Sequence, residues 1–213
     1  VYQCLVGDVS NEARDFYAAG SRRLLITCGK RKCRVDKIKV GIVGCGFVGG
    51  ALKAWLMANN AENCDVLVSD PPKGFNDDLG DIDIAFVQIH VPTEDDGTQD
   101  LTLMKRLIRE LPDVPVFVRT TILPGTSERL SRETGRRVRF MPEFLTERTH
   151  IEDFRRQPMV FPVEGDAADL ALLTRVFPSK KFVVMSALDA EITKYAHNVF
   201  GAYKVTYFNA VRE

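Results

Sequence analysis

The 213-residue sequence predicts an α/β fold with a doubly wound, mostly parallel sheet, followed by a long C-terminal helix. Three observations support this prediction. Strand-like and helix-like segments alternate from Ile38 onward. A glycine-rich turn joins the first of these strands to the first helix. Residues 188–213 carry one continuous helical pattern. Strands that alternate with helices are typical of parallel sheets covered on both faces.

Residues 1–37 are predicted to form an N-terminal appendage before the main domain. Two short apolar runs, 2–6 and 22–28, have the composition of strands. Between them a helix is expected, with Ser10 as a possible N-cap and Gly20 as its stop. No role is assigned to this appendage.

Residues 38–187 are predicted to form the main domain. Strands are expected at 38–43, 64–70, 83–90, 114–120, 137–141, 158–163 and 181–186. Helices are expected after the glycine turn and at 100–111, 126–134 and 166–177. In the helix at 100–111, apolar residues recur at helical spacing and Asp100 is the expected N-cap.

The turn after the first strand matches G-x-G-x-x-G and reads Gly44-Cys45-Gly46-Phe47-Val48-Gly49. The strand before it and the helix after it give this motif its meaning. Gly44 allows a tight turn, Gly46 lets the backbone approach a pyrophosphate, and Gly49 lets the helix pack on the strand. Free N–H groups at the helix N-terminus then face the phosphates. The motif therefore predicts a Rossmann-type dinucleotide site.

Asp70 ends the second strand, about twenty residues after the last glycine. A carboxylate at this place accepts a hydrogen bond from a ribose 2′-hydroxyl and repels a 2′-phosphate. The sequence therefore predicts NAD as the cofactor rather than NADP.

Three later segments follow predicted strands: "HVPTEDDG", "TTILPGT" and "MPEFLTERT". We expect all three to be loops at the carboxyl ends of strands, where open α/β sheets bind their ligands. A fourth segment with polar residues at regular spacing, "DAEITKYAHNVFGAYKVTYFNAV", lies on the C-terminal helix.

Together these segments make residues 38–213 similar to the UDP-glucose/GDP-mannose dehydrogenase family. The ordered matches are the glycine motif, Val91-Pro92-Thr93, Thr121 with Pro124-Gly125-Thr126, Pro142-Glu143-Phe144-Leu145, and Glu191-x-x-Lys194-x-x-x-Asn198. The resemblance implies oxidation of the C6 alcohol of a nucleotide sugar, most simply UDP-glucose, to a carboxylate with two NAD in succession.

The resemblance also implies roles for individual residues. Lys194 and Asn198 are expected to stabilise the developing oxyanion at C6. Thr121 and Glu143 are expected to hold the water used in proton transfer and hydrolysis, and Glu147 to lie near the nicotinamide. Val91, Pro92, Thr93 and Thr121 are expected to line the cofactor site.

Helical spacing supports the first of these roles. Lys194 and Asn198 are four residues apart and so share one helix face, with Glu191 on the same face. An ammonium and an amide NH₂ directed at one oxygen can stabilise an oxyanion. The competing interpretation is a solvated Glu191–Lys194 pair of little energetic weight.

The resemblance further implies a nucleophilic cysteine and a nucleotide-binding domain beyond this helix, and neither is present in the sequence. The five cysteines are Cys4, Cys28, Cys33, Cys45 and Cys64, and none has the expected place. Met141 and Arg148 also depart from the family pattern. We therefore expect a truncated or incomplete dehydrogenase. Two alternatives remain open: an inactive NAD-binding sensor, scaffold or assembly protein, and a two-electron alcohol dehydrogenase of the hydroxyacid or phosphogluconate type.

Composition narrows the partners. The formal net charge is zero, which gives no indication of a nucleic-acid or membrane partner, and no apolar run is long enough to span a bilayer. The odd number of cysteines fits a reducing cytoplasm, and Cys28 and Cys33 lack the second pair of a zinc site, so no metal is expected. An apolar stripe at Ile192, Tyr195, Val199 and Tyr203 predicts core packing or a homodimer seam.

Overall fold

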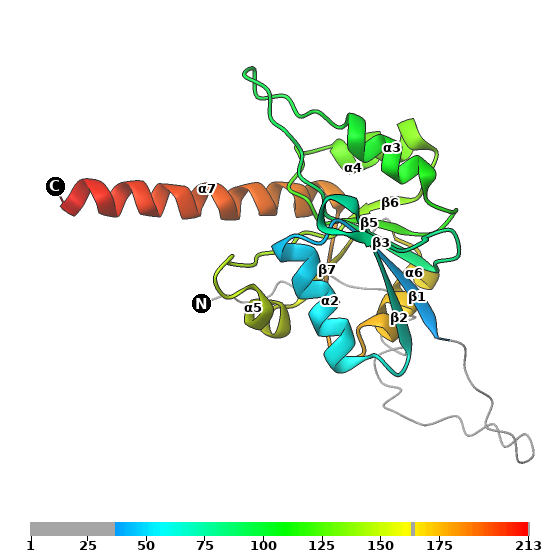
Figure 1. Cartoon of the computed structure of the whole chain (residues 1–213). Helices are drawn as coiled ribbons and strands as arrows, with labels where there is room; N and C mark the ends of the chain where they lie inside the picture. Colours follow the sequence, from blue (N-terminus) through cyan, green and yellow to red (C-terminus); the bar gives the residue numbers. More distant parts are fainter. Residues whose placement is uncertain (1–36, 163–164, 213) are drawn as a thin grey trace, which may run out of the picture. The chain divides into compact units, whose positions relative to one another are not determined.

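The computed structural model describes residues 37–162 and 165–212 (Figure 1). Within these residues six strands form one sheet, in the order β3-β2-β1-β4-β5-β6. The strands are β1 (Ile38–Val43), β2 (Cys64–Asp70), β3 (Phe75–Asn76), β4 (Ile84–Val87), β5 (Val116–Val118) and β6 (Val138–Phe140). All neighbours pair in parallel except β2 and β3. The chain leaves β1 toward β2 and later returns to β4, so the strand order reverses between β1 and β4.

Helices cover both faces of the sheet, as the sequence predicts (Figure 1). One face carries α2 (Phe47–Asn59), α5 (His150–Arg156) and α6 (Ala167–Val176). The other face carries α3 (Thr102–Glu110) and α4 (Thr126–Thr134). The fold is thus the predicted doubly wound α/β type.

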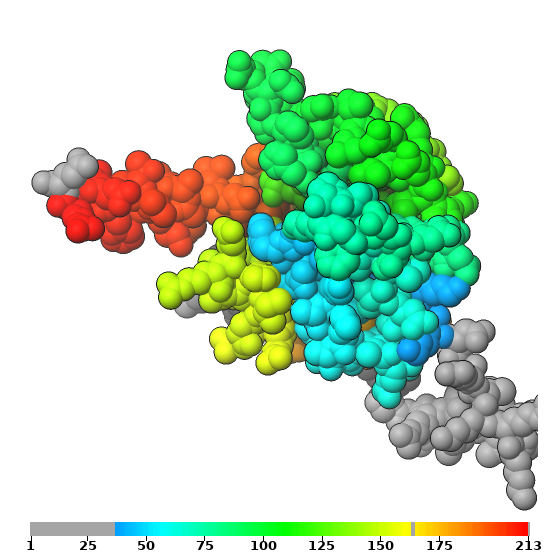
Figure 2. Space-filling view, in the orientation of Figure 1, coloured from blue at the N-terminus to red at the C-terminus, as the bar shows by residue number. Residues whose placement is uncertain are grey.

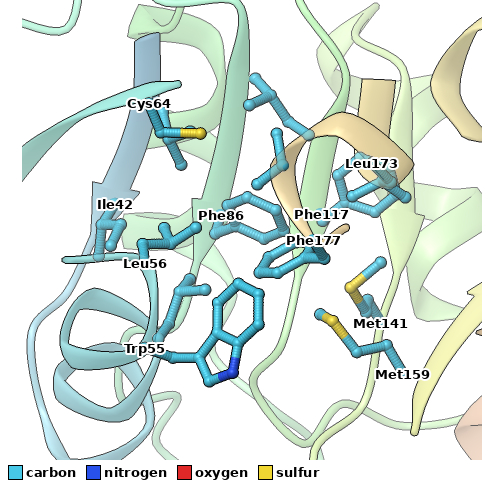
Figure 3. Packing of buried hydrophobic residues seen from close by; sticks show 14 of the residues in the cluster. Ile42, Trp55, Leu56, Cys64, Phe86, Phe117, Met141, Met159, Leu173 and Phe177 are labelled. Atoms are coloured by element: carbon cyan, nitrogen blue, oxygen red, sulfur yellow. The ribbon is translucent and has the colours of Figure 1, made fainter. Parts of the chain in front are cut away.

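The strands are buried on both faces, which explains their continuous apolar sequences. On the α2 face an aromatic cluster fills the core, and Figure 3 shows its rings gathered between the sheet and the helices. Phe177 lies 5.4 Å from Trp55 and 5.6 Å from Phe86 between ring centroids. This packing fixes α2, and with it the glycine turn, against the sheet.

Several local features differ from the sequence prediction. The short strand β3 and the 3₁₀ turn η1 (Pro71–Lys73) follow β2, and neither was expected. Helix α5 was also not expected. The strands β7 (Met159–Pro162) and β8 (Phe182–Met185) form a separate two-stranded parallel sheet. The expected appendage, residues 1–37, lies outside the described residues except for Lys37.

The predicted N-cap of α3 is wrong by one residue. The N-cap is Leu101, whose side chain is apolar. Asp100 lies one position earlier and accepts a hydrogen bond from the Thr102 N–H at 2.9 Å. Its carboxylate therefore still satisfies the first amide of the helix, from outside the helix.

The predicted C-terminal helix is α7 (Ala187–Arg212), which extends away from the sheet (Figure 1). The prediction that its apolar stripe packs in the core is wrong for Ile192, Val199 and Tyr203, which are 48%, 63% and 65% exposed. Figure 2 shows the outer turns of α7 projecting from the body of the domain. Across residues 37–162 and 165–212, no helix combines the length and apolarity needed to cross a bilayer.

Candidate functional site

A cleft of about 470 Å³ opens at the carboxyl ends of the strands, where the strand order reverses. Open α/β sheets bind their ligands at this place. The cleft is lined by the first residues of α2, by residues after β4 and β5, and by Glu143 after β6. Tyr195 of α7 also lines it. Four consecutive strands and the C-terminal helix therefore contribute to one site.

The glycine turn has the geometry that its sequence predicts. Gly44 has φ +87°, and a Cβ there would lie 2.5 Å from the Gln88 carbonyl oxygen. A Cβ on Gly49 would lie 2.1 Å from the Gly44 carbonyl oxygen. Gly44 therefore permits the turn, and Gly49 lets α2 approach the end of β1. The two glycines place the N-terminus of α2 at the cleft.

Asp70 and Lys73 hold the turn from the end of β2. The Asp70 carboxylate accepts a hydrogen bond from the Cys45 N–H at 2.7 Å, and the Lys73 ammonium donates to the Cys45 carbonyl at 2.9 Å. The Lys73 Nζ also lies 3.9 Å from the Asp70 carboxylate. The predicted carboxylate therefore stands at the turn, beside a cation.

Lys194 and Glu143 form a buried ion pair between α7 and the loop after β6. The Lys194 Nζ lies 2.9 Å from Glu143 Oε1 and 2.5 Å from the Glu143 carbonyl oxygen. Their side chains are 5% and 7% exposed. The other carboxylate oxygen accepts from the Leu145 N–H at 2.6 Å. Two residues predicted to be catalytic thus meet directly, and Glu143 lines the cleft.

Glu191, one turn before Lys194, caps a different helix. Its carboxylate accepts from the Gly125 N–H at 2.5 Å and from the Ser127 N–H at 2.8 Å, at the start of α4. Glu191 is fully buried. The interpretation of Glu191 and Lys194 as a solvated pair is therefore wrong. Each side chain instead fixes α7 to a separate part of the domain.

Curated proteins that resemble this chain in sequence include nucleotide-sugar dehydrogenases. No family model matches the chain. A UDP-glucose 6-dehydrogenase of Pseudomonas aeruginosa is 28% identical over 152 residues, which cover 62% of this chain and 34% of the relative. A UDP-glucose 6-dehydrogenase of Rhizobium meliloti is 31% identical over 163 residues, which cover 65% of this chain and 37% of the relative. A GDP-mannose 6-dehydrogenase of Pseudomonas putida is 28% identical over 150 residues, which cover 61% of this chain and 34% of the relative.

The chain is similar in sequence to curated UDP-glucose and GDP-mannose 6-dehydrogenases over less than two thirds of its length. The predicted resemblance is therefore confirmed. The chain spans about a third of the length of the curated dehydrogenases that it matches. The crystal structure of a ternary complex of GDP-mannose dehydrogenase from Pseudomonas aeruginosa shares the fold, with a TM-score of 0.66 and 24% identity. That match covers 80% of this chain and 51% of the dehydrogenase.

Some of the other residues that the dehydrogenase resemblance singled out line the cleft, and others do not. Val91, Thr93 and Thr121 line the cleft. Asn198 is exposed on α7, where its side-chain oxygen lies 3.4 Å from His197 Nδ1. Glu147 is also exposed, and neither it nor Pro92 is among the lining residues. Glu143 and Thr121 thus line the cleft, Lys194 reaches it only through its bond to Glu143, and Asn198 is exposed on the helix.

Among the site residues that sequence reasoning missed are Lys73, Gln88 and Arg119. Lys73 follows Asp70 by three residues in η1, and a lysine so close to the acidic strand end was the available signal. Gln88 and Arg119 directly follow β4 and β5, and both line the cleft. Their signal was weaker: a polar residue that comes immediately after a fully apolar strand.

The described residues include two cysteines, Cys45 and Cys64, and both are free thiols. Cys64 is buried, and burial raises the pKa of its thiol. Cys45 is partly exposed within the glycine turn. In the described part of the chain, no group of three or more His, Cys, Asp or Glu side chains is arranged to hold a metal ion. Cys4, Cys28 and Cys33 lie outside the described residues.

Replacing Glu191 with alanine is expected to lower the free energy of unfolding by about 2–4 kcal/mol, because the buried Ser127 N–H and the partly buried Gly125 N–H lose their acceptor. Chemical denaturation measures this loss. Glu191→Gln keeps one carbonyl acceptor and is expected to lose less. Equal stability of all three proteins would contradict the capping role.

Proposed function

We propose that this chain is the cofactor-binding part of an NAD-dependent nucleotide-sugar 6-dehydrogenase, with UDP-glucose as the first candidate substrate. The observation that carries the proposal is the buried Lys194–Glu143 pair beside a cleft that starts at a glycine turn. A protein that only bound NAD would have no need of a buried lysine bonded to a carboxylate of the cleft lining.

The donor groups of the turn fit a dinucleotide. Helix α2 starts at the cleft without a side-chain cap and without an acidic residue in its first turn. Its first N–H groups and its partial positive charge therefore suit a diphosphate. Among the described residues, a Cβ on Gly46 would have only the Lys73 Nζ within 4 Å, at 3.8 Å, so the backbone there is open to a ligand. Asp70 would accept from the adenosine ribose.

In the proposed reaction, bound NAD supplies the hydride acceptor for the C6 carbon. Lys194 would donate a hydrogen bond to the oxygen that develops negative charge. Glu143, held by Lys194 and the Leu145 N–H, would keep the ammonium in place and orient a water together with Thr121. The loops after β5 and β6, together with α7, would thus act at the C6 carbon of the sugar.

The second candidate is an NAD-binding protein without catalysis, serving as a sensor, scaffold or assembly part. One observation favours it: Asn198, the expected second donor to the oxyanion, is exposed on α7 rather than in the cleft lining. NADH formation from NAD and UDP-glucose, followed by absorbance, separates the two candidates. A chain that binds NAD but forms no NADH with any nucleotide sugar supports the second.

Asp70→Ala is expected to weaken NAD binding by about tenfold, because the turn loses a charge-assisted hydrogen bond and the ribose loses its acceptor. Calorimetric titration with NAD measures the affinity. Asp65→Ala is the matched control, because Asp65 is in the same strand, is half exposed and, among the described residues, forms an ion pair only with Lys37. Identical NAD affinity of the Asp70 variant and the wild type would count against this site.

We also propose that α7 mediates a homodimer. Its exposed apolar face includes Val199, Phe200, Tyr203, Tyr207 and Val211, each more than half exposed. An apolar face of this size is rarely left uncovered in a soluble chain. The proposed dimer covers it with the same face of a second copy.

Tyr203→Glu is expected to convert the dimer to a monomer, because it places a charge within the apolar face. Sedimentation velocity measures the change. Asn209→Glu is the control, because helical spacing places Asn209 on another face of α7. A wild-type chain that sediments as a monomer at about 100 μM, a generous concentration for a stable homodimer, would refute the proposal.

A further inference from the structure

Arg119 carries a buried guanidinium with two nitrogens that have no hydrogen-bonding partner among the described residues. It follows β5 directly, and the residue is only 3% exposed. Its Nε and Nη1 make no hydrogen bond within the described part of the chain. The centroid of the Phe154 ring lies 5.3 Å from the guanidinium carbon. A buried cation without a partner is unfavourable, and burial lowers the pKa of Arg119 to about 10.

The nearby carboxylate does not neutralise this cation. Glu143 raises the pKa of Arg119, but its two oxygens are already bound by the Lys194 ammonium and the Leu145 N–H. A further cation, Lys180, lines a small cavity together with Arg119 and Glu143. The Lys180 ammonium donates to the carbonyls of the last turn of α5. This region therefore holds three cations and one carboxylate.

Arg119 lies between two spaces of different size. It lines the small cavity of about 10 Å³ and also the main cleft. The small cavity has room for roughly one water-sized group, so it excludes a carboxylate. Any larger anion must therefore reach Arg119 from the cleft, which Thr121 and Glu143 also line.

Strand register explains why Arg119 faces this part of the cleft. Val87 of β4 pairs with Val118 of β5, so Gln88 and Arg119 are the next residues on the two adjacent strands. Their side chains share one face of the sheet, which alternation sets opposite to that of Val87 and Val118. Gln88 is also buried, and its amide has no partner in the described residues. Two orphaned polar side chains thus lie side by side at the same edge.

We propose that Arg119 is a receptor for a carboxylate on the ligand that occupies the cleft. The planar guanidinium matches a carboxylate with parallel hydrogen bonds. Identification of this carboxylate with the acid formed by oxidation at C6 rests on the proposed function. Binding of a carboxylate at Arg119 does not, and it holds or fails independently of NAD chemistry.

The test compares a sugar acid with its neutral analogues. D-glucuronate, D-glucuronamide and D-glucose are titrated into the full chain at constant ionic strength, with binding followed by ligand-observed NMR. We expect D-glucuronate to bind at least about tenfold more tightly than D-glucuronamide, and Arg119→Met to abolish the difference. Equal binding of the three ligands by the wild type, or an unchanged preference in Arg119→Met, would overturn the proposal.

Thermal stability separates a ligand-binding role from a structural one. Because Arg119 is buried without a partner, Arg119→Met is expected to keep or raise the melting temperature while losing the preference for glucuronate. A structural Arg119 predicts a lower melting temperature, and this outcome would overturn the proposal. Arg132→Met, which removes an exposed arginine on α4, is the matched control.

NAD titration of the same samples keeps this proposal distinct from the proposed function. A wild type that prefers glucuronate but does not bind NAD would defeat the cofactor assignment and support the carboxylate site. A wild type that binds NAD normally without that preference would defeat the carboxylate site alone.

Discussion

Lys194→Met is expected to lower the free energy of unfolding by about 3–5 kcal/mol. The substitution removes one partner of a buried ion pair and leaves the Glu143 carboxylate without its cation. The lost Nζ also bonded the Glu143 carbonyl, so a backbone acceptor loses its donor. Chemical denaturation measures the change. The methionine side chain retains most of the lysine's apolar volume, which confines the effect to the charge.

A double-mutant cycle assigns this loss to the pair. Glu143→Gln alone leaves a buried ammonium, and the combined variant removes both charges. We therefore expect the double variant to be more stable than the sum of the two single losses predicts. Lys204→Met, at an exposed position of the same helix, is the control and is expected to change stability by less than about 0.5 kcal/mol. Additive losses would show that the pair does not act as a unit.

The parts of the fold that sequence reasoning predicted correctly are those encoded locally. The strand at 38–43 is an apolar run, and the glycines after it fit only a turn with positive φ and close packing. Asp70 was predicted at this turn because the end of one parallel strand lies beside the end of the next. Each of these inferences needed only neighbouring residues and a known strand geometry.

The partners of the α7 residues required tertiary structure. Spacing paired Glu191 with Lys194 because they are three residues apart on one helix. In the fold Lys194 bonds Glu143, 51 residues away, and Glu191 bonds Ser127, 64 residues away. Two long-range contacts replaced one local contact, and no periodicity in the sequence records them.

The exposure of α7 could not be predicted from the sequence for a different reason. An apolar stripe has the same sequence whether it packs on its own domain or on another chain. The length of the helix takes Val199 and Tyr203 beyond the sheet, so the monomer leaves them exposed. Asn198 is exposed with them, which is why the oxyanion role expected for it gains no support from its position.

Gly49→Ala is expected to lower the free energy of unfolding by about 3 kcal/mol, the upper part of the range for overpacking. A Cβ at this position would lie 2.1 Å from the Gly44 carbonyl oxygen, which is backbone and cannot rotate away. Helix α2 must therefore move from β1 by more than an ångström to accept the methyl group. Because α2 presents its N-terminus to the cleft, NAD binding is expected to fall with stability.

The adjacent glycine provides a matched control. A Cβ on Gly50 would meet no atom within 4 Å, and this residue lies in the same helix. Gly50→Ala is therefore expected to raise stability by about 0.5–1 kcal/mol, because alanine favours a helix interior, and to leave NAD affinity unchanged. Chemical denaturation and calorimetric titration of both variants test the contrast. If the two substitutions had the same effect, the close approach of α2 to the Gly44 turn would not be what forms the proposed diphosphate site.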